Sequence, residues 1–301
     1  MKRPARRPST RASEPRKVTS RAAPLPVRGI ALPAPPPVPP IVALTTDIGW
    51  SYAAQMKAVL LRAVPDLRIV DVTHEVGSHQ ILEGAFLLRH AGSWFPPRTI
   101  HIGIVDPGVG GRRAPLAIAC GDGSHLVGPD NGLLAPLADF LGDPRAVRLD
   151  PDRVAPDAPL SPTFEGRDLF ARAAALLAMG KTIHDIGTPT EFMHLRIPSP
   201  TPISGGSSVM VLHVDHFGNL ITNLPTSEFA ERFGAPGGTV AVSAEGRTFR
   251  ANIARTYEEV PSGGLGAIGS SFGLLELAVN RGRARDLLGI RANARIELRR
   301  L

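Results

Sequence analysis

Short apolar runs that alternate with helical patterns constrain the fold of this chain more than any other feature. Residues 41–46 (IVALTT) are apolar and β-branched, as in a buried strand. Residues 52–64 repeat apolar side chains at helical spacing and end at Pro65, and residues 68–72 read as the next strand. The pattern then predicts a helix over 81–91, strands over 99–105, 116–120 and 125–127, and a helix over 168–179. This alternation predicts an α/β layer with a largely parallel sheet.

The composition of the sequence changes after residue 196. Residues 197–208 are rich in Pro, Gly and Ser, which is typical of a linker. Beyond them the apolar runs are short and β-like, at 209–214, 239–243, 247–251 and 294–298. We therefore predict an N-terminal α/β domain over 41–196, a linker over 197–208, and a smaller β-rich C-terminal domain over 209–301.

The positive charge of the chain is concentrated at its N-terminal end. The net charge is +7, and residues 1–40 hold nine Lys or Arg and one Glu, so the remainder is about neutral. This segment also contains a Pro-rich run, which favours a disordered tail. A polyanion-binding arm is the alternative reading, but with a neutral main body we expect no nucleic-acid partner.

Composition excludes several further classes. With 43% hydrophobic and 20% charged residues the chain is globular, and it contains no apolar run long enough to span a membrane. Cys120 is the single cysteine, so an internal disulfide is impossible and a thiolate metal site has no support. We expect a cytoplasmic protein without a membrane partner.

Polar residues gather where the predicted strands end. Any one of these motifs alone is explained by a turn. In an open α/β sheet, however, the carboxyl ends of the strands face a common crevice where ligands bind. We expect one shared cleft for four groups: Thr46 with Asp47, Asp71 with His74, the run from Asp106 to Gly110, and Asp130 with Asn131 and Gly132.

The string DPGVG (106–110) is the most informative of these motifs. Its proline and glycines fix a backbone that a ligand can approach closely. Arg112 and Arg113 follow, and a guanidinium beside Asp106 would keep that carboxylate ionised, although a solvated arginine pair is an equal alternative. The glycine spacing matches neither a P-loop nor a dinucleotide fingerprint.

Three later motifs carry further candidates. In TFEGRDLF (163–170), helix capping and a local ion pair account for Arg167 and Asp168 but leave Glu165 unexplained. DHFGN (215–219) combines a carboxylate, an aromatic ring and an amide, but is also a plausible tight turn. GSSFGLLELAVN (269–280) would place Glu276 on a helix face, with a core helix as the plain alternative.

A metal-dependent hydrolase is an alternative that the sequence leaves open. Its ligands would come from carboxylates and imidazoles near the strand ends, but no HxxxH, HxH or DxH motif fixes their geometry. The candidate ligands are Asp47, Asp71, His74, His79, Asp106 and Asp130.

Taken together, these motifs resemble the S-adenosyl-L-methionine (SAM) hydroxide adenosyltransferases, which are SAM hydrolases related to fluorinase and chlorinase. The resemblance runs collinearly over about residues 41–290 through TTDIG (45–49), VTHEV (72–76), LEGAF (82–86), VDPGVG (105–110), PDNG (129–132), FEGRD (164–168), DHFGN and GSSFGLLELAVN. It implies hydrolysis of SAM to adenosine and L-methionine by water attacking the 5′ carbon. SAM is then the substrate, and no cofactor is implied. The assembly implied is a homotrimer with sites between the N-terminal domain of one subunit and the C-terminal domain of its neighbour.

The resemblance also assigns roles to individual residues. Asp47 would hold the ribose hydroxyls, and the catalytic Asp, Arg and His of the family map to Asp106, Arg113 and position 165. This chain has Glu165 there instead of histidine. The remaining substrate contacts implied are Asp215, Phe217, Asn219, Ser271, Glu276 and Val279. A protein that binds SAM or adenosine without turnover is the further alternative.

Overall fold

The structure is a computed structural model that describes residues 40–156 and 159–301. The predicted tail lies outside the described residues, apart from Pro40. Among the helices that are described, none is long and apolar enough to cross a bilayer.

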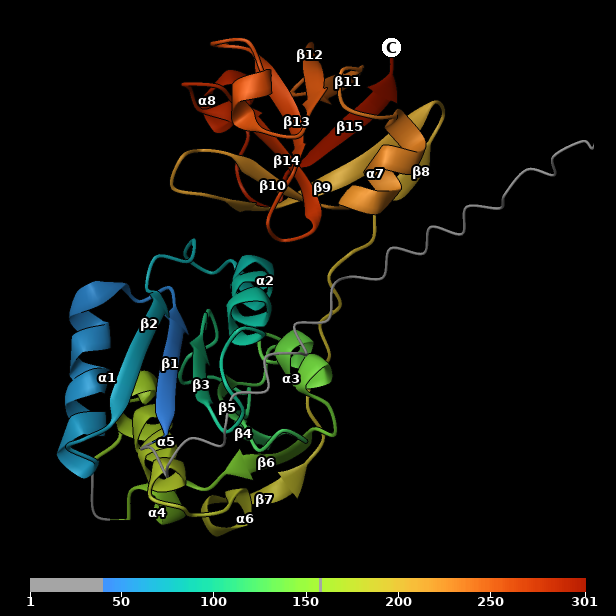
Figure 1. Ribbon diagram of the computed structural model, residues 1–301. Coiled ribbons are helices and arrows are strands. Elements are labelled where there is room, and N and C mark those ends of the chain that lie inside the picture. The colour runs from blue at the N-terminus through green and yellow to red at the C-terminus, as the bar shows by residue number, and fades with distance from the viewer. Residues whose placement is uncertain (1–39, 157–158) are drawn as a thin grey trace, which may run out of the picture. The chain divides into compact units, whose positions relative to one another are not determined.

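The first sheet has seven strands and confirms the α/β prediction. Its order is β2-β1-β3-β5-β4-β6-β7 (Figure 1). The first four strands in this order pair in parallel, and the pairings from β5 to β7 are antiparallel, so the sheet is mixed. The strands are β1 (Ile41–Thr46), β2 (Arg68–Thr73), β3 (Ile100–Ile104), β4 (Pro115–Ala119), β5 (His125–Pro129), β6 (Arg145–Leu149) and β7 (Gly187–Thr190).

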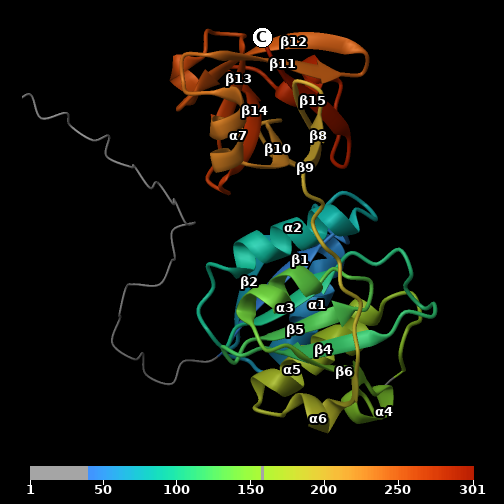
Figure 2. The same cartoon turned by 90° about the vertical axis from the view of Figure 1, so that its right-hand side faces the viewer.

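Helices cover both faces of this sheet, which explains why its central strands are apolar throughout. One core joins α1 and α5 to the sheet, and a second core joins α2 and α3 to the other face (Figures 1 and 2). The helices are α1 (Gly49–Ala63), α2 (Ile81–Gly92), α3 (Ala135–Leu141), α4 (Pro151–Val154), a π-helical turn η1 (Gly166–Phe170), α5 (Ala171–Ala178) and α6 (Ile183–Ile186).

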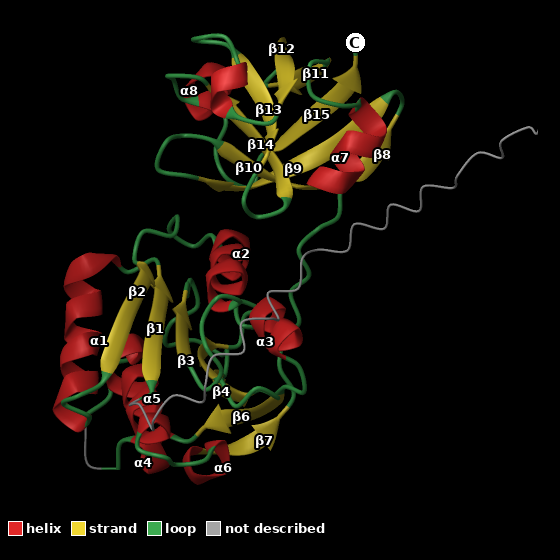
Figure 3. Ribbon diagram, in the orientation of Figure 1, coloured by secondary structure: helices red, strands yellow, loops and turns green. Residues whose placement is uncertain are grey.

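The second sheet has eight strands, in agreement with the predicted β-rich C-terminal part (Figure 3). Its order is β10-β14-β13-β12-β11-β15-β9-β8, and a further pairing of β9 with β10 closes it into a barrel. The elements are β8 (Thr201–Ile203), β9 (Gly206–Val214), β10 (Leu220–Pro225), α7 (Thr226–Phe233), β11 (Thr239–Ala244), β12 (Arg247–Ala254), a 3₁₀ turn η2 (Tyr257–Glu259), β13 (Leu265–Gly269), β14 (Leu274–Val279), α8 (Ala284–Leu288) and β15 (Arg295–Arg300).

Two local expectations differ from the structure. Part of the segment expected as a linker, residues 201–208, belongs to β8 and the start of β9, which pair with each other across a turn at Gly205. The motif GSSFGLLELAVN contains strand β14 and not a helix, because its apolar run pairs with β10 and β13 on its two sides. The domain boundaries themselves stay a prediction.

Candidate active site

The parallel strands of the first sheet bring most of the predicted polar residues to one edge. Strands β2, β1, β3 and β5 run in the same direction, so their carboxyl ends lie side by side. Asp47 follows β1, Asp106 lies two residues beyond β3, and Asp130 follows β5. This edge is where an α/β sheet binds its ligands.

Asp106, Arg113 and Glu165 form one ion-paired cluster at this edge. The Arg113 Nε–H donates to both Asp106 carboxylate oxygens, at 3.1 and 3.0 Å, and its Nη2 group pairs with Asp106 and with Glu165. The side chains are 6%, 10% and 20% exposed respectively, so water screens these charges only weakly. One guanidinium is therefore shared by two carboxylates, which leaves the ionised cluster with a net charge of about −1.

The two carboxylates also act on the arginine. Burial works to lower the pKa of Arg113, but the hydrogen bonds and charges of Asp106 and Glu165 outweigh it and raise that pKa above its usual range. Arg113 is thus a fixed cation. Its neighbour Arg112 is exposed, so only one member of the predicted arginine pair enters the cluster.

The backbone of the DPGVG turn makes this cluster possible. The Gly108 N–H donates to Asp106 Oδ1 at 3.2 Å, which fixes the carboxylate over its own turn. Gly110 has a φ of +71°, and a side chain there would collide with the carbonyl of Pro162. The turn therefore approaches the segment before Glu165 as closely as only glycine allows. Glu165 itself immediately precedes the π-helical turn η1, a feature often found at functional sites.

Asp47 is the second predicted site residue at the same edge. Its Oδ2 accepts a hydrogen bond from the His79 N–H at 3.1 Å, and its own N–H donates to Ile104 O at 3.1 Å. Within the described residues, no hydrogen bond to Asp47 Oδ1 occurs, so this carboxylate has one oxygen available for a ligand.

The other polar residues at the edge are bonded to the protein itself. Asp130 Oδ1 accepts from the Met193 N–H at 2.7 Å, and Asn131 bonds to Val105 and Leu133. His74 is bonded to Thr46 and Asp71. No three His, Cys, Asp or Glu side chains of residues 40–156 and 159–301 are grouped as a metal site. The metal-ligand set considered from the sequence is therefore not assembled by these side chains.

The predicted residues of the C-terminal part form a separate group. The turn between β9 and β10 is the DHFGN motif, in which Asp215 accepts hydrogen bonds from the Asn219 N–H and side-chain amide, at 2.8 and 3.1 Å. Phe217 at its tip is 71% exposed. Glu276 on β14 is buried and accepts a hydrogen bond from the Tyr257 hydroxyl at 2.7 Å. Val279 ends β14 and Ser271 is exposed in the turn before it.

Burial and neighbouring acidic groups raise the pKa values of both Glu276 and Tyr257. Burial and the charge of Asp215 raise the pKa of Glu276, although the Tyr257 hydrogen bond opposes them. Burial and the Glu276 carboxylate raise the pKa of Tyr257. Sequence reasoning missed Tyr257, since nothing in its local string marks a partner 19 positions away.

The described residues show no direct bond between the two groups of predicted residues. No hydrogen bond or ion pair of the described residues joins Asp106, Arg113, Glu165 or Asp47 to Asp215, Asn219, Tyr257 or Glu276.

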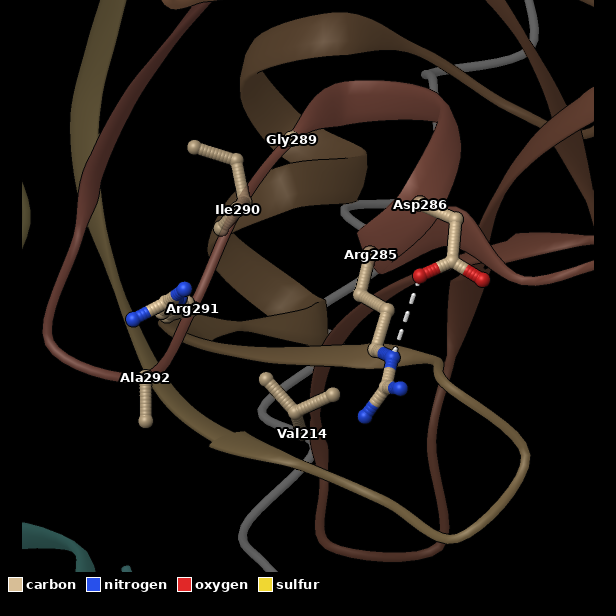
Figure 4. A pocket seen from close by; sticks show the side chains of 7 residues that line it. All are labelled: Val214, Arg285, Asp286, Gly289, Ile290, Arg291 and Ala292. Carbon is tan, nitrogen blue, oxygen red and sulfur yellow. Dashed lines mark hydrogen bonds and ion pairs between the residues drawn. The ribbon is translucent and has the colours of Figure 1, made fainter.

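The hollow near the DHFGN turn is lined by none of the predicted site residues. It has a volume of about 630 Å³ and is formed by Val214, Arg285, Asp286, Gly289, Ile290, Arg291 and Ala292 (Figure 4).

Comparison with known proteins gives a consistent result along the chain. The family model for the SAM hydroxide adenosyltransferase N-terminal domain matches residues 42–187, and the C-terminal domain model matches residues 209–297. A protein of Salinispora tropica named (R)-S-adenosyl-L-methionine hydrolase is 38% identical, over 86% of this chain and 97% of that protein. A Thermus thermophilus protein of the same name is 39% identical, over 82% and 94%. More distant relatives named fluorinase are 28% identical.

A solved structure agrees with these sequence matches. The crystal structure of an uncharacterized conserved protein from Thermotoga maritima superposes with a TM-score of 0.79 at 32% identity, covering 86% of this chain and all of that one. Since both family models match in order and together span most of the described residues, this chain belongs to the SAM hydroxide adenosyltransferase family.

Proposed function

We propose that this protein hydrolyses SAM to adenosine and L-methionine by attack of water on the 5′ carbon. The observation that carries the proposal is the Asp106–Arg113–Glu165 cluster, in a chain whose relatives are named (R)-S-adenosyl-L-methionine hydrolase. Asp106 and Arg113 occupy the positions that the family resemblance assigns to catalysis.

The reaction demands little beyond the placement of water. The sulfonium is already a good leaving group, so the enzyme has to hold a desolvated water in line with the bond from C5′ to sulfur. As the C–O bond forms and the C–S bond breaks, methionine leaves as a neutral thioether and the positive charge moves to the attacking oxygen. Asp106 accepts a proton from that oxygen and later releases it to solvent.

Arg113 and Glu165 keep the base in position. The Arg113 Nε–H donates to both oxygens of Asp106, which orients the carboxylate, and Glu165 pairs with the Nη2 group of the same guanidinium. In this chain the Glu165 carboxylate therefore binds Arg113 from the position where the family resemblance implies a histidine. Its negative charge also favours the attacking oxygen as that atom becomes positive.

The remaining predicted site residues would bind the substrate. The free oxygen of Asp47 is suited to the ribose hydroxyls, and the buried Glu276 carboxylate to the substrate ammonium. Asp215, Phe217 and Asn219 would contact the methionyl and adenosyl parts, Ser271 the amino-acid end, and the backbone near Val279 the adenine. Following the family resemblance, we propose a homotrimer in which neighbouring subunits complete each site. We propose a cytoplasmic enzyme that needs no cofactor.

Incubation of the purified protein with SAM tests this function. We expect chromatography to show adenosine and methionine in equal amounts, and Asp106→Asn to lose at least about 10²-fold in rate because it lacks a base. Asp66→Asn, in an exposed turn, is the matched control. Both sulfonium epimers are supplied, since the relatives carry an (R) designation.

Three outcomes would overturn the proposal. SAM binding by calorimetry without adenosine release would indicate a binding protein. Activity that EDTA abolishes and a divalent metal restores would indicate a metal-dependent hydrolase. Full activity of Asp106→Asn would remove Asp106 from the reaction.

A further inference from the structure

The His74 side chain is the most completely buried titratable group near the candidate site. It is 0% exposed, and each ring nitrogen has one partner: Nδ1 lies 2.9 Å from Thr46 Oγ1 and Nε2 lies 3.0 Å from Asp71 Oδ1. The edge of the His74 ring also packs against Trp50, with centroids 4.8 Å apart. No role in the proposed reaction uses this imidazole.

A second contact comes from the backbone of the same residue. The His74 carbonyl accepts a hydrogen bond from the Gly49 N–H at 3.0 Å. Thr46 immediately precedes Asp47, and Gly49 follows it by two positions. His74 thus binds the chain on both sides of Asp47, at Thr46 through its ring and at Gly49 through its carbonyl.

Asp71, the partner of Nε2, determines which nitrogen of the His74 ring carries the proton. The Lys57 ammonium lies 2.9 Å from Asp71 Oδ2. Burial opposes ionisation of Asp71, but the hydrogen bonds of Lys57 and His74 outweigh it and lower the Asp71 pKa. An ionised Asp71 can only accept, so Nε2 bears the hydrogen, and in the neutral ring Nδ1 accepts from the Thr46 hydroxyl. These bonds form a continuous chain from Lys57 through Asp71 and His74 to Thr46.

We propose that His74 is a positioning residue that sets the Asp47 carboxylate for recognition of the substrate's ribose diol. The inference rests on the proposed function in one respect, the assignment of the ribose to Asp47. Asp47 has two further bonds: its N–H donates to Ile104 O, and its Oδ2 accepts from the His79 N–H, while no hydrogen bond to Oδ1 occurs among the described residues. A diol bound by a carboxylate needs both hydroxyls within hydrogen-bond distance, so a small rotation of the 46–49 segment loses part of this contact.

Substitution of Thr46 tests the positioning role of His74 with the least disturbance of the fold. Thr46→Val keeps the shape of the side chain and removes the bond to His74, whereas Thr46→Ser keeps the hydroxyl. Thr99→Val is the matched control, because Thr99 is equally buried, bonds to Pro96 O at 2.7 Å and precedes a different strand. All three variants are first compared by thermal unfolding and circular dichroism.

The measurement is calorimetric binding of adenosine, 2′-deoxyadenosine and 3′-deoxyadenosine. We expect the wild type, Thr46→Ser and Thr99→Val to prefer adenosine, and Thr46→Val to lose about tenfold of this preference, the size of one charge-assisted hydrogen bond. A merely structural role would weaken the three ligands equally and leave their ratio unchanged. With SAM, KM should rise more than kcat falls.

Each outcome decides the inference. A Thr46→Val protein that keeps the preference for the intact diol overturns it, as does a wild type without any such preference. Imidazole nitrogen chemical shifts of the wild type provide a test that needs no variant, and a hydrogen on Nδ1 instead of Nε2 would also overturn it. A wild type that discriminates between the nucleosides but releases no adenosine from SAM refutes the proposed function alone.

Discussion

At the scale of single residues, Glu165 is where this chain departs from the pattern that the family resemblance implies. Its carboxylate pairs with the same Arg113 Nη2 group that pairs with Asp106, and it is the most exposed member of the cluster. A neutral imidazole at this position can also accept a hydrogen bond from the guanidinium. The identity of residue 165 therefore matters less to the orientation of Asp106 than the presence of an acceptor for Arg113.

We expect Glu165→His to retain turnover within a few-fold, and Glu165→Leu to lose about tenfold or more because Arg113 then has one anchor only. The measurement is kcat/KM for SAM across the neutral pH range. Glu191→Leu, a substitution of an exposed glutamate, controls for loss of charge alone. Loss of turnover in Glu165→His would show that the carboxylate itself takes part in proton transfer.

The sequence predicted part of this site for physical reasons. Asp106 and Arg113 are seven positions apart around a glycine turn, so a local pattern was enough to suggest their pairing. The contact of Arg113 with Glu165 spans 52 positions and depends on how closely Gly110 approaches Pro162. The local string alone marked Glu165 only as unexplained, and it was the family resemblance that assigned it to the catalytic set. Tyr257 carried no local signal at all, because its partner Glu276 lies on β14, 19 positions further along the chain.

At the scale of elements, β3 is a fully buried strand that carries an ionisable side chain. All five residues from Ile100 to Ile104 are buried, and His101 is 1% exposed. Its Nδ1 has no hydrogen-bond partner among the described residues. Burial lowers the pKa of His101 from 6.5 to about 4, so this strand is built around a neutral imidazole.

This strand predicts acid sensitivity. Between pH 6.5 and 4 the unfolded chain binds a proton at His101 that the folded chain does not, so the free energy of unfolding falls as pH falls, by up to about 3 kcal/mol. Burial likewise lowers the pKa of His90, on α2, to about 4. Urea unfolding at pH 7 and pH 5 measures the effect.

We expect His101→Leu to lose less stability than the wild type over this interval, and His184→Leu, a change at an exposed histidine, to behave as the wild type does. Equal losses in all three proteins would mean that other groups cause the acid sensitivity.

The first five strands of the first sheet were predictable because apolar runs such as residues 41–46 are bounded by clear turn and helix signals, whereas β6 and β7 were not predicted. The run LLELAV was not, since a short apolar segment fits a buried strand or a buried helix equally well. Its pairing with β10 and β13 decides the matter, and both partners lie elsewhere in the sequence. Residues 201–208 show the same limit, because composition alone does not reveal strand pairing.

At the scale of the whole molecule, the proposed homotrimer has a testable consequence. If neighbouring subunits of a homotrimer complete each site, two inactive variants with lesions in different groups should complement each other. Asp106→Asn and Glu276→Gln are suitable, since one affects the proposed base and the other the proposed ammonium contact. Random mixing would restore about a quarter of the wild-type activity, because a site then has to draw an intact group from each variant.

Mixed assemblies are obtained by co-expression and their mass is measured by sedimentation. The control pairs Asp106→Asn with Arg113→Leu, two lesions in the same group, and should restore nothing. Mixed Asp106→Asn and Glu276→Gln protein that is no more active than its parents would refute the shared site, and a monomeric active wild type would refute the trimer.

The position of β15 bears on how the protein is made. This strand lies between β11 and β9, yet it follows both in the sequence, by about 50 and 80 residues. The barrel cannot close before residue 300 has left the ribosome, roughly 5 to 20 seconds after β9 was synthesised. During that interval β9 and β11 each present an unpaired edge, which is the usual origin of wrong strand pairing. The β-rich half of the nascent chain therefore exposes unpaired strand edges until its last strand has been made.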